Sequence, residues 1–409
     1  MDIMITFLPP IIWVSSFYDS SVWPSFNSNP RLVGDINGDG AADIVGFSDN
    51  GIKVSYSTGG NFTAPTNSLG AFCKNVGGWT SQDLYPRLLG DVNGDKIADI
   101  VGFGYDAVYV SISDAYRIND ATRWIYDFSY SNGGWTSFDR YPRALGDFNG
   151  DGKDDIIGFG YDSVYVSLSN GNQFLTRTIA SSEFTVLAGW TTYDQTPRMV
   201  ADVNGDGKAD IVGFNSQGTW VALSNGVTFD KATLWSTSFG WESFNQNPRI
   251  VKDLNGDKKA DIIGFGDSST GYSLSNGSGF DNPEWLMYYF GRNSQVEGFD
   301  TFDSKPRFMA DANRDGYNDI IGFGGEGVRV AVIFPNYNPN LLEVGEKSFR
   351  DSAKDAQKMI KESSYAGIFE YLAFFVLLGI GVTTFLIIVG AKKEKNAHIS
   401  GARNEYVRL

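Results

Sequence analysis

The chain has 409 residues, of which 42% are hydrophobic and 15% aromatic, with 48 glycines, one cysteine and a formal net charge of -15. Such a composition favours many short strands joined by tight turns over a long helical array. An acidic chain without a basic stripe excludes DNA and RNA as expected partners, and a single cysteine, Cys73, excludes an intrachain disulfide.

The N-terminal region contains one strand-like segment before any repeat begins. Residues 11–23, "IIWVSSFYDSSVW", have the pattern of an outer strand without inner strands of its own. The residues before it lack a basic region and include Pro9 and Pro10, which makes a poor signal peptide. Either targeting is unconventional or the sequence starts inside a longer reading frame.

A unit that begins with an acidic loop then recurs six times, as in "DVNGDGKADIVGF" from Asp202. The first aspartates of successive loops are 56, 56, 55, 51 and 58 residues apart, which is close to the length of one four-stranded propeller blade. Residues 86–113 show the order within a unit: a short apolar run, the acidic loop, "DIVGF", and then "VYVSIS" with alternating polarity. This order predicts strand, loop, strand, turn, strand, and a fourth, outer strand is expected around "WIYDFSY", residues 124–130.

Each acidic loop places side-chain oxygens at positions 1, 3, 5 and 9, which is a ligand pattern that suits Ca²⁺. Position 12 is glycine in all six loops, where an EF-hand needs a bidentate glutamate, and a strand follows instead of a helix. We therefore predict strand-to-strand calcium loops that hold up to six ions. The expected ligands are Asp35, Asn37, Asp39, Asp43; Asp91, Asn93, Asp95, Asp99; Asp147, Asn149, Asp151, Asp155; Asp202, Asn204, Asp206, Asp210; Asp253, Asn255, Asp257, Asp261; Asp311, Asn313, Asp315 and Asp319.

A single loop of this kind is equally well explained as a metal-free Asx turn, and it is the sixfold recurrence that favours calcium over this alternative. The loops also differ from one another. Position 6 is Lys96 or Lys258 in two of them, and the sixth carries Arg314 at position 4. Because a positive φ is costly for a side chain larger than glycine, we expect weaker calcium binding where these residues occur.

The two ends of the repeat region complement each other. The sixth unit ends after "VRVAVIF" without an outer strand, and residues 11–23 provide an outer strand without a blade. The N-terminal strand can therefore complete the last blade and remove its exposed edge. The expected fold is an all-β propeller of six visible four-stranded blades over residues 1–340, and a seventh blade stays open in case a unit precedes this sequence.

The C-terminal region predicts a membrane anchor. Residues 371–391 contain no charge and are long enough to span a bilayer as a transmembrane helix, whereas a buried core helix is rarely so apolar. Residues 341–370 read either as an amphipathic stalk helix or as a solvated spacer. The lysines that follow the anchor place the tail, 392–409, in the cytosol and the propeller outside the cell or in a lumen, and "YVRL" at the end fits a sorting signal.

The unit from Gly133 to Phe174 resembles FG-GAP or VCBS-type repeats of integrin alpha-chain propellers, and it is still more similar to the repeats of the Psathyrella velutina lectin family. The likeness is carried by the order Gly-Trp, Pro-Arg, acidic loop, "DIIGFG" and "VYVSLSNG", and it covers about residues 13–335. The resemblance implies a calcium-bearing propeller with sugar pockets between blades. The lectin repeats have a histidine before the Pro-Arg pair, whereas this chain has residues such as Tyr85 and Thr196 there, so its sugar specificity is not carried over.

Two sets of recurrent residues are candidates for ligand contact. The tryptophans of the Gly-Trp corner either pack between sheets or offer a platform for a sugar ring, and they are Trp79, Trp135, Trp190 and Trp241. The arginines after the prolines either pair with the acidic loops or bind carboxylates of sialic acids, and they are Arg87, Arg143, Arg198 and Arg249.

Catalysis is not expected, because the only histidine, His398, lies in the cytosolic tail and most paired carboxylates belong to the metal loops. The sequence favours a single-pass protein of the plasma membrane or an endomembrane whose calcium-stabilised propeller binds an extracellular glycan or glycoprotein. The alternative is an integrin-like adhesion or scaffold module that binds protein without sugar. Two sequons, at Asn61 and Asn276, would permit glycosylation of a luminal propeller.

Overall fold

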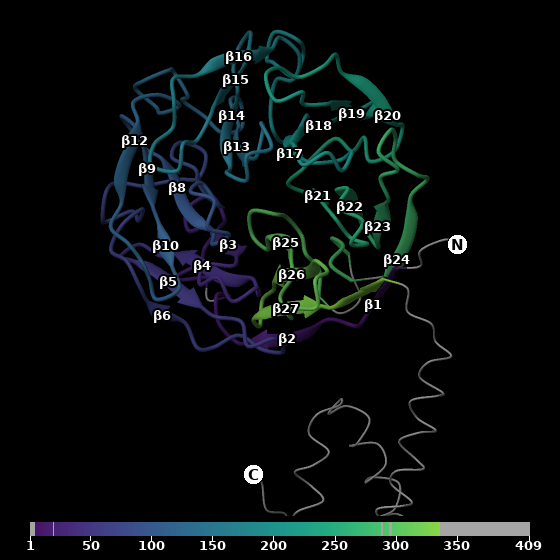
Figure 1. The fold of residues 1–409 in the computed structure, drawn as a ribbon. Coiled ribbons are helices and arrows are strands. Elements are labelled where there is room, and N and C mark those ends of the chain that lie inside the picture. The colour runs from purple at the N-terminus through teal and green to yellow at the C-terminus, as the bar shows by residue number, and fades with distance from the viewer. Residues whose placement is uncertain (1–4, 19, 288, 294–296, 336–409) are drawn as a thin grey trace, which may run out of the picture. The chain divides into compact units, whose positions relative to one another are not determined.

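The computed structural model describes residues 5–18, 20–287, 289–293 and 297–335, and all regular secondary structure in this part of the chain is β-strand. Six antiparallel sheets of four strands, the blades, surround a central axis (Figure 1). The expected stalk, transmembrane helix and tail lie outside the described residues. Within the described ranges, no helix is long and apolar enough to cross a bilayer.

The blades are numbered in the order of their innermost strands. Blade 1 comprises β3 (Arg31–Gly34), β4 (Asp43–Phe47), β5 (Ile52–Ser55) and β6 (Thr66–Asn67); blade 2 comprises β7 (Arg87–Gly90), β8 (Asp99–Phe103), β9 (Val108–Ser111) and β12 (Thr122–Ile125); blade 3 comprises β13 (Arg143–Gly146), β14 (Asp155–Phe159), β15 (Val164–Ser167) and β16 (Thr178–Ser181). Blade 4 comprises β17 (Arg198–Ala201), β18 (Asp210–Asn215), β19 (Gly218–Ala222) and β20 (Thr233–Ser236); blade 5 comprises β21 (Arg249–Lys252), β22 (Asp261–Phe265), β23 (Thr270–Ser273) and β24 (Glu284–Met287); blade 6 comprises β25 (Arg307–Ala310), β26 (Asp319–Phe323), β27 (Val328–Ala331) and β2 (Ile11–Val14). Two further pairs join β1 (Ile5–Phe7) to β28 (Ile333–Pro335) and β10 (Ser113–Asp114) to β11 (Arg117–Ile118).

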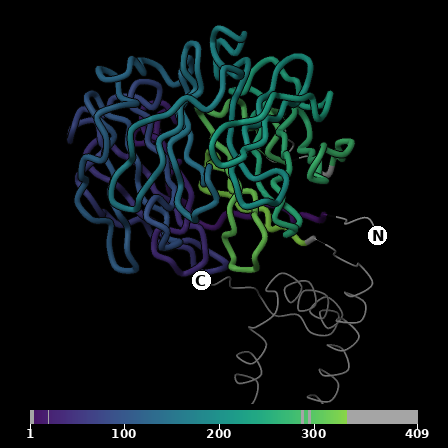
Figure 2. Tube along the Cα trace, turned by 45° about the horizontal axis from the view of Figure 1, so that its top comes forward, coloured from purple at the N-terminus to yellow at the C-terminus, as the bar shows by residue number. Residues whose placement is uncertain are grey.

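Blade 6 is closed by the N-terminal strand, as the complementary ends of the repeat region predict. Strand β2 pairs antiparallel with β27, with Ile11 opposite Val330 and Ile12 opposite Arg329. The innermost strands of neighbouring blades contact one another all the way round, including β25 against β3. The described chain therefore forms a ring of six blades, seen in two orientations in Figures 1 and 2.

The outer strand of blade 2 differs from its expected position. Strand β12 ends at Ile125, so residues 126–130 belong to the connection that leads to blade 3. Phe128 has φ of 51°, and an extended strand cannot continue through a residue in the left-handed region. The expected strand is therefore present but begins and ends earlier in the sequence.

The antiparallel order of each blade gives the propeller two distinct faces. The innermost strand runs to the acidic loop, and the second strand returns to a tight hairpin beside the Pro-Arg pair, as in β3 and β4. The acidic loops therefore lie on one face, here called the loop face. The hairpins between second and third strands, together with the connections that contain the Gly-Trp corners, lie on the opposite face, here called the hairpin face. The chain leaves blade 6 through β28 at the loop face, because Ile333 follows the end of β27 there and donates its N–H to Asp319.

Candidate functional site

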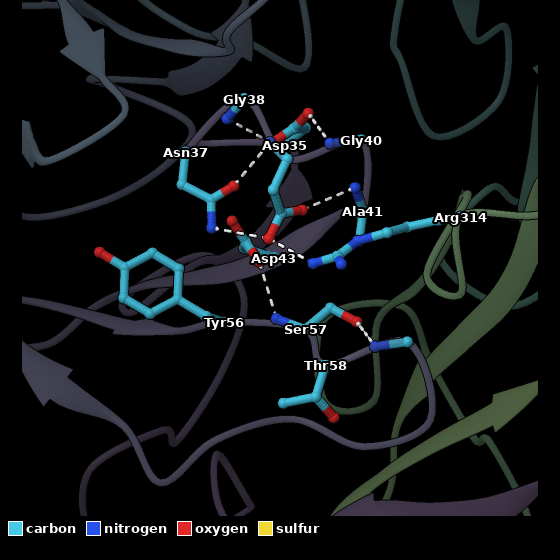
Figure 3. A network of polar contacts seen from close by, with 12 residues as sticks. Asp35, Asn37, Gly38, Gly40, Ala41, Asp43, Tyr56, Ser57, Thr58 and Arg314 are labelled. Carbon is cyan, nitrogen blue, oxygen red and sulfur yellow. Dashed lines mark hydrogen bonds and ion pairs between the residues drawn. The ribbon is translucent and has the colours of Figure 1, made fainter. Parts of the chain in front are cut away.

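The acidic loop of blade 1 shows how the expected metal ligands are arranged (Figure 3). The backbone N–H of Asp39 lies 3.1 Å from Asp35 Oδ1 and 2.9 Å from Asn37 Oδ1. The side-chain nitrogen of Asn37 lies 3.1 Å from Asp39 Oδ2. The oxygens of positions 1, 3 and 5 therefore gather around one tight turn, and the same bonds recur in blades 2, 3 and 6.

The aspartate at position 9 has a different environment. Asp43 is fully buried, and its two oxygens accept the N–H groups of Ser57 at 2.7 Å and Ile36 at 3.3 Å. Burial raises the pKa of Asp43 to about 7 despite these hydrogen bonds, and repulsion from Asp39 and Asp35 adds to the rise. The position-9 aspartates of all six blades share this shift. Position 9 therefore ties the loop to the sheet beneath it, and its negative charge is poorly compensated there.

The oxygens of these loops fit a hard cation in chemistry. No group of three or more Asp, Glu, His or Cys side chains in the described ranges lies close enough to hold a metal ion. The side-chain oxygens that the turn gathers, those of positions 1, 3 and 5, are the ones that would hold calcium, and oxygen ligands of this kind are what the ion accepts. What the ion would supply is positive charge at the centre of a turn that carries several negative groups.

Basic side chains already contact the position-5 aspartate in four loops. Lysines at position 7 form the pairs Lys153–Asp151 at 3.1 Å, Lys208–Asp206 at 3.1 Å and Lys259–Asp257 at 2.6 Å, and Arg314 of blade 6 reaches across to Asp39 of blade 1. Solvent-accessible pairs of this kind are worth at most about 1 kcal/mol. They would therefore compete only weakly with a divalent ion.

Three loops carry a large residue at a position where the backbone adopts the left-handed conformation, which the sequence analysis expected to be costly. Lys96 and Lys258 at position 6 have φ of 68° and 69°, and Arg314 at position 4 has φ of 67°. The corresponding residues of other loops are glycines in the same region, such as Gly38 at 74°. These three side chains therefore occupy positions that glycine fits better.

The recurrent tryptophans are mainly core residues. Trp79, Trp135 and Trp190 are 3–8% exposed, and Trp241 is half-buried. Each lies against a phenylalanine of the same connection, as Trp135 does against Phe128 with ring centres 5.1 Å apart. The tip of an indole occupies the space beside the glycine of the second strand in blades 1 to 5, and the ring of Phe299 does so beside Gly322 in blade 6. These aromatic rings explain why position 12 is glycine in every loop. The tryptophans therefore pack between the sheets, and their use as a platform for a sugar ring stays a prediction.

The arginines after the prolines have neither of the partners that the sequence suggested. Arg87, Arg143, Arg198 and Arg249 are at most 1% exposed, and none forms an ion pair within the described part of the chain. Arg143 donates to the carbonyl of Trp135 at 3.1 Å, and its guanidinium lies 5.4 Å from the ring centre of Phe103 in the preceding blade. Burial lowers the pKa of Arg143 to about 9. Pairing with the acidic loops was therefore a wrong expectation, because the two groups lie at opposite ends of the innermost strand, and a buried guanidinium cannot bind sialic acid.

A closed chain of hydrogen bonds on the hairpin face was not anticipated from the sequence. In each blade, an Asp or Asn three residues before the proline donates its backbone N–H to the side-chain oxygen of its counterpart in the neighbouring blade, at 2.7–3.0 Å. The six members of this Asx ring are Asn27, Asp83, Asp139, Asp194, Asn245 and Asp303. The signal was present in the sequence as Asx-x-x-Pro-Arg in all six units.

Two cavities open beside the hairpins of blades 1 and 2, and Gly70 lines both of them. The blade-1 pocket has a volume of ≈ 560 Å³ and a polar lining that includes Asp49, Asn50 and Lys53. The blade-2 pocket has a volume of ≈ 520 Å³ and an aromatic lining. Its aromatic residues are Phe72, Trp79, Tyr85, Tyr105 and Tyr109.

The blade-2 pocket combines apolar walls with a few polar groups. Tyr105 is 61% exposed and its ring stacks on Tyr130, with centres 5.7 Å apart and planes at 20°. Asp106 accepts the hydroxyl of Tyr109 at 2.8 Å, and Arg123 lies 3.3 Å from the Asp106 carboxylate. Such a lining suits a small ligand that has both an apolar face and hydroxyl groups.

Comparison with known proteins supports the repeat assignment. Residues 35–102 and 202–264 match the model of the FG-GAP-like repeat. No curated protein matches the chain. Among solved structures, the chain is similar to the pore of the Photorhabdus luminescens Tc holotoxin, with 16% identity and a TM-score of 0.55. The match covers 80% of this chain and 14% of the toxin chain. At this identity the likeness concerns the fold alone.

A second solved structure is much more similar in sequence. It is an Agrocybe aegerita lectin, described for its specific recognition of non-reducing terminal N-acetylglucosamine. The two chains are 32% identical with a TM-score of 0.63, and the match covers 81% of this chain and 90% of that chain. This protein therefore belongs to the family of FG-GAP-like repeat propellers that includes the Agrocybe aegerita lectin.

Proposed function

We propose that the protein is a single-pass membrane lectin whose calcium-stabilised propeller, outside the cell or in a lumen, binds glycans or glycoproteins that end in N-acetylglucosamine. The observation that carries this proposal is the 32% identity to the Agrocybe aegerita lectin over 90% of that chain. The match extends over 81% of this chain, and a shared fold and repeat over this length support a shared ligand class.

The blade-2 pocket is the proposed sugar site. The axial C–H groups of a pyranose form an apolar face that packs on an aromatic ring, and Tyr105 offers such a ring at the mouth of the pocket. The carboxylate of Asp106 is placed to accept sugar hydroxyls, and the glycines of the connection, Gly77 and Gly78, allow backbone to approach the ligand closely. The volume of ≈ 520 Å³ is suited to one or two sugar units.

The membrane and calcium parts of the proposal have separate support. The apolar segment 371–391 supports the anchor, and the gathered oxygens of the acidic loops support calcium. The chain leaves the propeller on the loop face, whereas both pockets open on the hairpin face. The proposed sugar site is therefore on the face opposite to the exit of the chain.

A glycan array probed with the full-length chain in detergent tests the proposal, with one half of the sample dialysed against EGTA. We expect binding to glycans with terminal N-acetylglucosamine and weaker binding after calcium removal, because the propeller loses stability. Binding to no glycan would overturn the proposal. If the chain then still bound surface proteins from which glycosidases had removed the sugars, the integrin-like adhesion alternative would be favoured.

A further inference from the structure

The two sequons of the chain fall on the same element of the propeller. Asn61 lies in the hairpin between β5 and β6 of blade 1, and Asn276 lies in the hairpin between β23 and β24 of blade 5. The hairpins are equivalent, because Ser57 and Ser275 begin them and donate their N–H groups to the position-9 aspartate of their own blade at 2.7 Å. Figure 3 shows this contact for Ser57.

Both hairpins belong to the loop face. The hydroxyl of Ser57 donates to the carbonyl of Ala312 at 2.6 Å, and the hydroxyl of Ser275 donates to the carbonyl of Val203 at 2.6 Å. These carbonyls belong to position 2 of the acidic loops of the preceding blades, blade 6 and blade 4. A sugar attached at either hairpin would therefore stand beside the acidic loops and away from the hairpin face.

The sequon residues are exposed, whereas the residue between them fastens the hairpin. The asparagine and the hydroxyl residue of each sequon are exposed, and they are Asn61, Thr63, Asn276 and Ser278. Phe62 is 5% exposed and packs on Trp13 of blade 6, with ring centres 5.4 Å apart. Because successive residues of an extended chain point to opposite sides, burial of Phe62 directs its two neighbours toward solvent. A bulky, hydrophilic oligosaccharide requires such a surface position.

The amide nitrogens that would carry the sugars make no hydrogen bond within the described part of the chain. Asn276 uses its side-chain oxygen, which accepts the N–H of Ser278 at 3.0 Å and its hydroxyl at 2.9 Å, and the side chain of Asn61 has no hydrogen bond among the described residues. By contrast, Asn225, at the position of Asn276 in blade 4, donates its amide to Thr228 at 2.9 Å and belongs to no sequon. A sugar on Asn61 or Asn276 therefore breaks no hydrogen bond of the fold described here.

The two sequon hairpins flank the point at which the chain leaves the propeller. Blade 6 lies between blades 5 and 1 in the ring (Figure 1). In blade 6, Ile333 takes the place of Ser57 and Ser275, since it donates its N–H to Asp319 at 2.9 Å, and the chain continues there into β28. Three consecutive blades thus carry a sequon, the exit and a sequon, whereas the equivalent hairpins of blades 2, 3 and 4 contain none.

We propose that Asn61 and Asn276 each carry an N-linked oligosaccharide, so that two glycans flank the exit of the chain on the loop face; this rests on the extracellular or luminal placement of the propeller in the proposed function. The co-reactant is an oligosaccharide that a membrane lipid carries through a pyrophosphate. The asparagine Nδ2 forms a bond to C1 of the first sugar, and the bond between C1 and the pyrophosphate oxygen breaks. The lipid pyrophosphate leaves, and the amide nitrogen gives up one of its two protons to the transferase.

Electrophoresis of the full-length chain from eukaryotic cells, with and without a peptide N-glycosidase, counts the glycans. We expect the natural chain to gain mobility on treatment, Asn61→Gln and Asn276→Gln each to lose one step of this shift, and the double variant to lose both. Asn225→Gln, on the equivalent hairpin of blade 4, is the matched control and should keep both steps. Ser278→Thr preserves the sequon and should keep both steps as well.

A gained sequon tests the placement of the propeller separately. Val227→Thr creates the triplet Asn-Gly-Thr at the hairpin position of blade 4 that corresponds to Ser278 in blade 5. Val227 is 73% exposed, so the variant should fold as the natural chain does. We expect a third step in its shift, because this hairpin enters the same compartment as the other two.

The outcomes separate this inference from the proposed function. A natural chain with fewer than two steps, or a double variant that still shifts, overturns the pair of glycans. If Val227→Thr then gains a step, the placement of the propeller stands. If neither the natural chain nor Val227→Thr shifts, that placement is wrong too, whereas sugar binding on the glycan array is measured independently of both results.

Discussion

The glycine at position 12 of the repeat gives the sharpest test of how the blades are packed. A methyl group added to Gly158 of β14 would lie 2.5 Å from Trp135 Cη2 and 2.7 Å from Phe128 Cε1. Carbon atoms that are not bonded normally lie about 3.5–4.0 Å apart. Gly158→Ala therefore creates two overlaps of about 1 Å with rings that are themselves buried.

Neither side of this contact can move freely. Gly158 pairs with Arg143 on one side and Tyr165 on the other, in the middle of the sheet. Overpacking of a core by one carbon costs about 1–3 kcal/mol, and we expect the upper end, about 3 kcal/mol, because two rings must shift. With an unfolding entropy of ~0.7 kcal/mol per kelvin for a domain of this size, the melting temperature should fall by about 4 °C.

Calorimetry of the full-length chain measures this shift. Gly60→Ala is the matched control, since no heavy atom lies within 4 Å of its added carbon and Gly60 is exposed; it should melt within about 1 °C of the natural chain. In a Trp135→Leu background, Gly158→Ala should cost less, because one of the two clashing rings is gone. An unchanged melting temperature for Gly158→Ala, or the same cost with and without Trp135, would refute the packing argument.

Three further predictions concern the ring, the loops and the metal. Asp139→Ala removes the oxygen of the Asx ring that accepts the N–H of Asp194, and it should cost about 1–2 kcal/mol in denaturant titrations. Asp139→Asn should cost little, since Asn27 and Asn245 accept in the same way, and equal losses for both variants would contradict the prediction. Lys96→Gly should raise stability by up to about 1 kcal/mol, because φ is 68° there, and a lower melting temperature would show that the side chain contributes more than the backbone costs. Removal of calcium with EGTA should lower the melting temperature, since each loop adds about 2.7 kcal/mol when the calcium concentration is 100 times its dissociation constant. An unchanged melting temperature, with no calcium found by elemental analysis beforehand, would exclude the ion.

Local patterns in the sequence determined much of this architecture. The spacing of the acidic loops gave the blade length, alternating polarity gave the strands, and the unmatched ends of the repeat region indicated that β2 completes blade 6. These features depend on hydrophobic periodicity and on repetition, both of which are visible along the chain. The tyrosines of blade 2 were visible too, but nothing in the linear sequence placed Tyr85 and Tyr105 against the same ring, that of Tyr130.

The tertiary structure alone decided what the recurrent polar and aromatic residues contact. The Phe residues with positive φ precede their tryptophans at variable spacing, as in Phe128–Trp135 and Phe239–Trp241, so no fixed motif revealed them. Arg143 lies between the carbonyl of Trp135 and the ring of Phe103, a residue of another blade. Partners of this kind lie in neighbouring blades or in different parts of one connection, and only the packing of one blade against the next brings them into contact.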